Sequence, residues 1–387
     1  MWIHTRAKAE EWLGAQQPDK PTLLFDSAAL QSRYFEFKDT FPGLISYAVK
    51  ANAKDAVLRA LCDAGLNCFD IASIPELKRV LSHSPKAICH YHNPIRSRQD
   101  NLTALAAGVK TFSIDRLSEL DKLSDCLGEI TPAEIELSIR FKLPTFGGAY
   151  DFGSKFGADL PMAAKLMRAG KLAGYRISLT FHPGTQCTRL SAWSDYIEAA
   201  AKLSKDTQID IERLNVGGGF PAHRGEWVPE LGDIFRQIDD AVNAHFDNLP
   251  KLVCEPGRAM VADTTLLVTQ VNAIDGNGVY LNDGVYGCLS EARDLSMTKR
   301  IGFCGYNGRP LPDGASRQPT QFFGPTCDSL DAFIAEVPLP SELRAGDYIL
   351  FEGMGAYSNE LNTQFNGFGE HQWVHLPQVS HHLAQAI

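Results

Sequence analysis

Two hydrophobic patterns alternate over the first two thirds of the chain. Stretches such as "IPELKRVLSH" and "RLSELDKLSDCL" have the 3.6-residue periodicity of amphipathic helices, and short apolar or β-branched runs lie between them. The strand-like runs are "LISYAVKAN", "CFDIAS", "AICHYHNP", "TFSID", "IELSIRF", "RISLTFHPG", "RLNVGGG" and "KLVCEPG". Eight such units predict a closed (β/α)8 TIM-like barrel over residues 27–261, because an open doubly wound sheet usually has fewer.

The pattern changes after residue 261. The runs "TTLLVTQVNAI", "GVYLND", "QPTQFFGP", "DYILFEGMGAY" and "QWVHLP" read as short strands separated by Gly, Pro, Asn and Asp turns. They predict a β-sandwich or β-barrel-like domain over residues 262–387. Another strand, "TLLFD", lies within residues 1–26 and belongs to one of the two domains. The predicted fold class is α/β, a barrel followed by a β domain.

Composition and charge narrow the function. The 387 residues are 44% hydrophobic and carry a net charge of -9, which argues against nucleic acid as a partner because binding a polyanion needs a clustered basic surface. No apolar run approaches the roughly 20 residues of a membrane helix, and the N-terminus lacks the order of a secretory signal. The nine cysteines form no CxxC pair, so we expect reduced thiols and no metal centre in a cytoplasmic enzyme.

Polar residues stand at the ends of five of the eight predicted barrel strands, and a glycine triplet follows a sixth. In a barrel the βα loops at the carboxyl ends of the strands form one mouth, where ligands bind. The residues placed there are Lys50, Asp70, Arg140, His182, the triplet Gly217, Gly218 and Gly219, and Glu255 with Arg258. Any one of them alone has an ordinary structural explanation. Their convergence from separate strands predicts a functional site.

Two segments favour a phosphorylated ligand. The three glycines of "VGGGFP" leave backbone N–H groups free to cradle an anion, and "EPGR" places Gly257 and Arg258 after the next strand. Lys50 stands opposite, inside an apolar run, where burial would lower its pKa and favour the neutral amine. Lysine, phosphate cradle and the carboxylate of Glu255 together suggest pyridoxal 5′-phosphate, with the lysine as Schiff-base partner and the carboxylate at the pyridine nitrogen.

The motifs "YAVKAN", "FDIAS", "HPGTQC", "NVGGGFP", "CEPGR", "FFGPTCDSLD", "GMGAY" and "FNGF" resemble those of the fold-type III pyridoxal-phosphate-dependent decarboxylases of basic amino acids, in particular the ornithine decarboxylases. The resemblance runs from about residue 20 to residue 370. In that family Lys50 matches the lysine that holds the cofactor, Glu255 the pyridine-nitrogen partner and His182 the ring-stacking histidine. The residues matching the phosphate site are Gly217, Gly218, Gly219, Gly257, Arg258, Tyr357 and Thr185. Asp70, Glu76, Arg140 and Lys155 match positions around the cofactor and the dimer interface.

The segment "GPTCDSLD" indicates which class of substrate the enzyme accepts. The resemblance implies a homodimer in which this segment enters the other subunit's active site. Cys327 would then protonate the substrate carbon after CO2 leaves, and Asp328 would bind the distal ammonium. Tyr286 and Phe365 would line the same pocket. The expected reaction is α-decarboxylation of L-ornithine to putrescine, which feeds polyamine synthesis, with L-lysine as another substrate.

The run "CLSEARDLSM" departs from the family pattern where ornithine enzymes supply a second distal aspartate. Asp294 or Glu291 would take that role, whereas Asp283 fits the pattern. Several alternatives stay open at this point. They are a decarboxylase of diaminopimelate, carboxynorspermidine or a modified diamino acid, an amino-acid racemase, and a non-catalytic decarboxylase-like binding protein. Glu255 favours decarboxylation over racemisation, because related racemases tend to pair the ring nitrogen with arginine.

Overall fold

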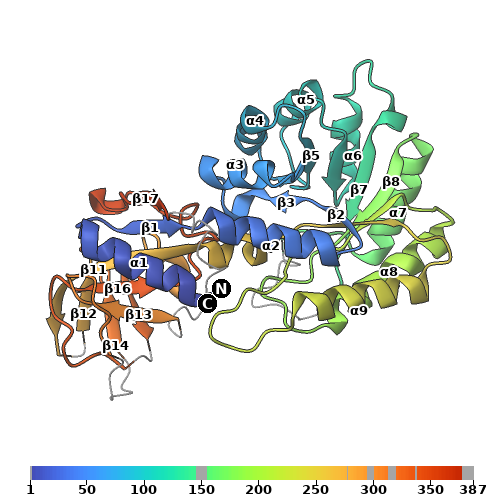
Figure 1. The fold of residues 1–387 in the computed structure, drawn as a ribbon. Coiled ribbons are helices and arrows are strands. Elements are labelled where there is room, and N and C mark those ends of the chain that lie inside the picture. The colour runs from blue at the N-terminus through green and yellow to red at the C-terminus, as the bar shows by residue number, and fades with distance from the viewer. Residues whose placement is uncertain are drawn as a thin grey trace. The chain divides into compact units, whose positions relative to one another are not determined.

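The computed structural model describes residues 2–144, 155–276, 278–293, 300–312, 320–335 and 338–376. The chain divides into two compact units (Figure 1). We call residues 34–221 and 228–260 the barrel unit, and residues 1–33, 222–227 and 261–387 the β unit. The domain limits given above, 27–261 and 262–387 with part of 1–26, stay a prediction.

Every strand run predicted for the barrel contains a strand. The strands described are β2 (Gly43–Ile45), β3 (Tyr47–Ala48), β4 (Cys68–Ile71), β5 (Ile88–Tyr91), β6 (Thr111–Ile114), β7 (Glu136–Arg140), β8 (Arg176–Thr180), β9 (Arg213–Asn215) and β10 (Lys251–Cys254). They form one parallel sheet in the order β2-β10-β9-β8-β7-β6-β5-β4-β3. Most of their residues are buried, as expected for parallel strands covered on both faces.

The first predicted strand closes the barrel. β2 and β3 are consecutive segments that pair with opposite ends of the sheet, β2 with β10 and β3 with β4. Between them the N–H of Ser46 donates to the carbonyl of Cys254 at 2.9 Å. The chain passes so close to β10 that a side chain on Gly43 would meet the backbone of Leu252. Only glycine fits at this point of closure.

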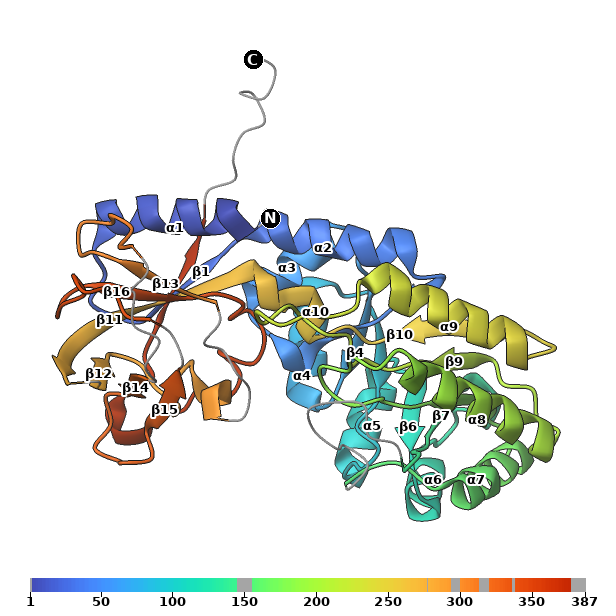
Figure 2. The same cartoon turned by 90° about the horizontal axis from the view of Figure 1, so that it is seen from below.

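Amphipathic helices lie outside the strands (Figure 2). Helix α4 shows why they form where they do: the hydroxyl of Ser73 accepts the N–H of Glu76 at the N-terminus, and Leu77 and Val80 are buried. The helices are α2 (Ser27–Thr40), α3 (Asp55–Asp63), α4 (Ile74–His83), α5 (Arg98–Ala106), α6 (Leu117–Ser124), α7 (Leu160–Leu172), α8 (Ser191–Thr207), α9 (Leu231–His245) and the short α10 (Arg258–Val261), with 3-10 turns η1 (Val49–Ala51) and η2 (Pro132–Glu134).

The β unit is built on a mixed sheet. Its elements are α1 (Trp2–Gln16), β1 (Thr22–Phe25), β11 (Thr265–Asp275), β12 (Gly278–Leu281), β13 (Ile301–Cys304), β14 (Thr320–Phe323), β15 (Ala332–Ala335), β16 (Tyr348–Phe351) and β17 (Gln372–His375), with 3-10 turns η4 (Ala262–Thr264), η5 (Ser290–Arg293) and η6 (Phe365–Gly367). The long strand β11 pairs with β1, β12 and β16. The "TLLFD" strand therefore belongs to this sheet, and the predicted fold class is confirmed.

Three elements of the β unit were not expected from the sequence, namely the strands β13 and β15 and the helix α1. Helix α1 buries Ala9 and Leu13 in a core cluster that also contains Leu24 of β1 and Tyr348 of β16. Among the residues that the structure describes, none of the helices combines the length and the apolar character that crossing a bilayer requires.

Candidate active site

The carboxyl ends of the barrel strands surround one cavity of about 220 Å3. The residues that line it are Lys50, Asp70, Ala72, His92, Asn93, Pro94, Arg140, Lys155, Phe156, Thr180, Phe181, His182 and Glu255. They come from the ends of β3, β4, β5, β7, β8 and β10 and from the loops that follow. Five strand-end residues singled out from the sequence therefore meet in one place. His92 joins them, and sequence reasoning had overlooked it.

Lys50 occupies the short turn η1, directly after β3. Its neighbours Val49 and Ala51 are buried, as the apolar run suggested, but Lys50 itself is exposed. The expectation of a buried lysine was wrong. The strand has ended at this point, so the side chain extends into the mouth of the cavity instead of the packed barrel core.

A buried cluster of ionisable groups forms one wall of the cavity. Nδ1 of His92 hydrogen-bonds Oε1 of Glu255, and the same nitrogen lies 3.7 Å from Oδ1 of Asp70. Asn215, at the end of β9, donates its side-chain N–H to Oε1 of Glu255 as well. Facing carboxylates raise each other's energy when both are charged. The histidine between them offsets part of that repulsion.

The two carboxyl groups of this cluster have opposite pKa shifts. Burial, together with the nearby charge of Glu255, raises the pKa of Asp70 to about 7. Burial also acts to raise the pKa of Glu255, but the charge and hydrogen bond of His92 outweigh it and hold that pKa well below its ordinary value. Glu255 is therefore the ionised member of the pair and Asp70 the one that holds a proton more readily.

His182, two residues beyond β8, is neutral. Burial and the positive charges of Lys50 and Arg140 lower its pKa to about 3. Its Nδ1 accepts the N–H of Gly184 at 3.1 Å, which fixes the ring and assigns the proton to Nε2. A neutral imidazole held in this way can lie against an aromatic ligand without adding charge.

The glycine triplet after β9 forms a turn in which side chains do not fit. Gly217 and Gly219 have φ angles of +69° and +81°. A side chain on Gly218 would approach the carbonyl of Glu255 to 2.7 Å and Nε2 of His182 to 3.3 Å. The triplet thus brings bare backbone next to two residues of the cavity wall, as an anion cradle requires.

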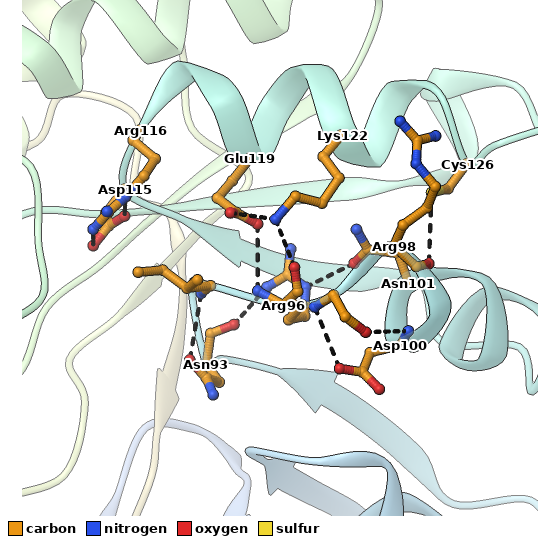
Figure 3. Close-up of polar contacts among 12 residues, drawn as sticks. Asn93, Arg96, Arg98, Asp100, Asn101, Asp115, Arg116, Glu119, Lys122 and Cys126 are labelled. Carbon is orange, nitrogen blue, oxygen red and sulfur yellow. Dashed lines mark hydrogen bonds and ion pairs between the residues drawn. The ribbon is translucent and has the colours of Figure 1, made fainter.

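Arg96 fixes the wall that Asn93 and Pro94 contribute (Figure 3). It is 3% exposed, and its guanidinium donates to the carbonyl oxygens of Asn93 at 2.5 Å and Ser113 at 2.6 Å and to Oδ1 of Asn101 at 2.8 Å. Burial lowers the pKa of Arg96 to about 10, partly opposed by Glu119, so the group stays charged. The loop after β5 is thus tied to strand β6 and to helix α5.

Asp115, directly after β6, contacts the segment that carries the cavity residues Lys155 and Phe156. Its carboxylate accepts hydrogen bonds from Arg116 at 2.7 Å and from the N–H of Gly157 at 3.0 Å. Gly157 follows the cavity residues Lys155 and Phe156. The guanidinium of Arg140 and the ammonium of Lys155 both lie over the ring of Phe156, at 5.4 and 5.1 Å from its centre.

A second group of chemically active side chains lies within the β unit. A groove of about 500 Å3 is lined by Cys327 and Asp328, among others. The hydroxyl of Tyr286 donates to Oδ2 of Asp328 at 2.5 Å, and the ring of Phe365 lies 4.8 Å from that of Tyr286. Oδ1 of Asn366 accepts both the N–H and the thiol of Cys327 at 3.2 Å. Asn366 had not been singled out, although the "FNGF" motif contained it.

Two acids of the β unit are committed to structural contacts. Asp283 accepts the N–H groups of Gly284 and Cys288 and so shapes the turn that carries Tyr286, and burial raises its pKa to about 7. Glu291 pairs with Arg224 at 3.1 Å, so its charge is already balanced. Asp294, the other acid considered for the distal contact, lies outside the described residues.

The remaining predicted site residues fall near these two groups. Thr185 lies in the loop after His182, and the backbone of that loop meets Gly219 through Cys187. Gly257 packs against Ala51, and the buried Arg258 begins α10. Tyr357 adopts a left-handed backbone with a φ angle of +65° in the β unit. Glu76 accepts the N–H of Ala72 at 2.6 Å, next to the cavity.

The barrel cavity fits pyridoxal 5′-phosphate. The glycine turn supplies space and N–H groups for a phosphate, since the N–H groups of Gly218 and Gly219 make no hydrogen bond within the described residues. Lys50 offers an amine, and Glu255 offers an ionised carboxylate for a protonated ring nitrogen. His182 supplies a neutral ring.

Comparisons with known proteins agree with this chemistry. Residues 27–262 match the family described as pyridoxal-dependent decarboxylase, pyridoxal binding domain. The probable ornithine decarboxylase of Dictyostelium discoideum is 29% identical over 350 residues, 83% of this chain and 72% of that protein. The lysine/ornithine decarboxylase of Selenomonas ruminantium is 28% identical over 341 residues, 84% of this chain and 81% of that protein.

Solved structures extend the likeness over both units. The crystal structure of the Paramecium bursaria Chlorella virus arginine decarboxylase superposes with a TM-score of 0.84 at 26% identity, over 96% of this chain and 100% of that one. The cofactor and enzyme class expected from the sequence are confirmed. The chain belongs to the pyridoxal-dependent decarboxylases and is a pyridoxal-phosphate-dependent carboxy-lyase of the class that acts on ornithine, lysine or arginine.

Proposed function

We propose that the protein decarboxylates L-ornithine to putrescine and CO2, with L-lysine as its second substrate. The observation that carries this choice is the Asp328 carboxylate, held by the Tyr286 hydroxyl in the groove that Cys327 shares. A carboxylate is the natural receptor for a terminal ammonium, and a hydrogen-bonded one is fixed in orientation. The names of the relatives, which include ornithine and lysine/ornithine decarboxylases, support the same substrates.

The groove has the character of a site for a substrate with one carboxylate. In the part of the chain that the structure describes, neither lysine nor arginine lines it. Diaminopimelate carries a second carboxylate, which would lie near the negative charge of Asp328 with no cation to balance it. Phe365, whose ring contacts Tyr286, supplies an apolar surface suited to a methylene chain.

The barrel unit would hold the cofactor. Bound pyridoxal 5′-phosphate supplies an electron sink for the electron pair left when the bond between Cα and the carboxylate breaks. Lys50 would hold the cofactor through its side-chain amine. Glu255 would keep a proton on the ring nitrogen, His182 would support the ring face, and the turn at Gly217–Gly219 with Arg258 would bind the phosphate.

Cys327 and Asp328 would act on the substrate in a homodimer, each pair serving the partner's barrel. Among the nine cysteines of the chain, Cys327 alone is exposed, so its thiol is accessible in this chain to a second copy. It would return a proton to Cα after CO2 has left. Asn366, which accepts the thiol hydrogen, keeps the thiol directed.

A substrate panel tests the proposed reaction. CO2 release is measured with L-ornithine, L-lysine, L-arginine, meso-diaminopimelate and carboxynorspermidine, and products are identified by mass. We expect kcat/KM to be highest for ornithine, then lysine. Asp328→Asn, which keeps the shape and removes the charge, should lower kcat/KM for ornithine roughly 10- to 100-fold. Asp275→Asn, an exposed acid on β11, is the matched control. Preference for diaminopimelate or an unaffected Asp328→Asn variant would contradict the proposal.

Subunit mixing tests the shared site separately. Lys50→Ala and Cys327→Ala homodimers should each be nearly inactive. Random mixing makes half of the dimers mixed, with one intact site in each, so about a quarter of wild-type activity should return. Activity that stays at the level of the single variants would mean that each chain completes its own site.

A further inference from the structure

The carboxylate of Glu255 is held on one side only. His92 and Asn215 both direct their hydrogen bonds to the same oxygen, Oε1. Within the described residues, the other oxygen, Oε2, receives no hydrogen bond. Glu255 lines the cavity, so the oxygen left over is the one available to a ligand there. The two donors thus leave Oε2 as the oxygen that a ligand in the cavity can contact.

Asn215 connects this carboxylate to the glycine turn. Its Oδ1 accepts the N–H of Gly217 at 2.9 Å, which settles the orientation of the amide and turns the NH2 group toward Glu255. One side chain therefore ties the phosphate end of the site to the ring-nitrogen end. A change in the position of Gly217 would therefore also move the hydrogen bond to Glu255, and the reverse.

His92 adds charge to this hydrogen bond. It is 7% exposed, and burial alone would lower its pKa, but the carboxylates of Glu255 and Asp70 raise that pKa above its ordinary value. The titratable and charged groups that surround it are Glu255, Asp70, His90, Arg213, Glu136, Lys50 and Arg140. A positive His92 favours the ionised form of the carboxylate that it contacts directly.

We propose that His92 and Asn215 are positioning residues that keep Glu255 ionised and present its Oε2 to the ring nitrogen of the cofactor. The inference rests on the role of Glu255 given under Proposed function and deepens it. Ring nitrogen and carboxylate share one proton, which lies on the nitrogen when the carboxylate is the weaker base. Removing His92 raises the pKa of the carboxylate more than that of the more distant ring. The shared proton then moves from the nitrogen to Glu255.

Nitrogen NMR of the bound cofactor tests this without relying on turnover. The holoenzyme is prepared with pyridoxal 5′-phosphate labelled with 15N in the ring, and the ring-nitrogen shift is followed from pH 6 to 9. The wild type should show a protonated ring throughout. His92→Ala and Asn215→Ala should move the shift toward the unprotonated value at pH 7 and lower kcat roughly 10- to 100-fold with little change in KM. His92→Asn, which keeps a neutral donor at the Nδ1 position, should restore part of both.

Control variants distinguish the positioning role of His92 and Asn215 from a role in packing alone. His90→Ala removes a buried imidazole from β5, two residues before His92, and should leave the ring protonated. A folded His92→Ala or Asn215→Ala enzyme with a protonated ring and unchanged kcat would overturn the proposal, as would an unprotonated ring in the wild type. If His92→Ala does not fold, the comparison of His92→Asn with Asn215→Ala decides. The wild type could decarboxylate none of the amino acids tested and still give the expected NMR shifts. That result would refute the proposed substrate and support this inference.

Discussion

The barrel cavity and the groove of the β unit hold their reactive groups in different ways. In the cavity, Glu255 and His92 lie at strand ends, are almost fully buried and hydrogen-bond each other. In the groove, Cys327 and Phe368 lie on connecting segments and are exposed, the latter by 43%. Strand ends are positioned by the sheet, whereas connecting segments depend on local side-chain contacts.

The difference indicates that the cavity and the groove have separate roles. The cavity needs a fixed array of charges, because the same cofactor must be bound in the same way for any substrate. In the proposed function the groove selects the amino acid, and its contacts are few enough to change independently. We therefore expect changes in the cavity to affect all reactions equally, and changes in the groove to affect the choice of substrate or the fate of the product.

Lys50→Ala is the strongest test of this separation of roles. Without the amine the cofactor has no covalent partner, so turnover should fall by a factor on the order of 10³ or more with every substrate. Borohydride reduction followed by peptide mass spectrometry should place the cofactor on the Lys50 peptide in the wild type and on no peptide in the variant. Lys54→Ala, which removes a nearby lysine outside the cavity lining, is the control. Covalent cofactor at another lysine would refute the assignment.

Cys327→Ala, unlike Lys50→Ala, should impair turnover and leave cofactor binding intact. We expect turnover to fall about 10²-fold, the usual range for loss of a proton donor, while cofactor affinity stays within about twofold of the wild type. The affinity is followed by fluorescence titration of the cofactor-depleted protein. Cys62→Ala, in α3 of the barrel unit, should change neither quantity. A loss of cofactor affinity in Cys327→Ala would break the distinction between the two regions.

Tyr286→Phe removes only the hydroxyl that orients Asp328. A neutral hydrogen bond contributes about 1 kcal/mol, so kcat/KM for ornithine should fall about fivefold, mainly through KM. The ratio of ornithine to lysine turnover should shift at the same time, because the carboxylate gains freedom to meet a longer chain. An unchanged ratio, measured by competition between the two substrates, would show that Tyr286 does not fix the position of Asp328.

The same contrast explains which features the sequence could predict. The positions of the barrel strands followed from hydrophobic runs, so strand-end residues such as Lys50 and Glu255 could be brought together before the fold was known, although the first run is split into β2 and β3. His92 was overlooked because "ICHYHNP" reads as an ordinary strand end, and its importance comes from a hydrogen bond across the barrel to Glu255. Asn366 was overlooked because its contact with Cys327 joins segments 39 positions apart. The exposure of Lys50 depended on where β3 ends, a boundary that apolar runs define poorly.

Asp70 offers the finest comparison, because its effect is on the pH dependence of stability and leaves the reacting groups in place. Its pKa of about 7 lies above the value of an unfolded aspartate, about 4, so its contribution to stability is complete below that value and is lost as the pH rises through 7. Between pH 5 and 7 the free energy of unfolding should therefore fall by about 1 kcal/mol per pH unit from this group. Asp70→Asn, which cannot ionise, should flatten that slope in urea unfolding with the cofactor at saturation. Equal slopes in the two proteins would mean that Asp70 is already ionised at pH 5, and that the histidine between the two carboxylates compensates both charges.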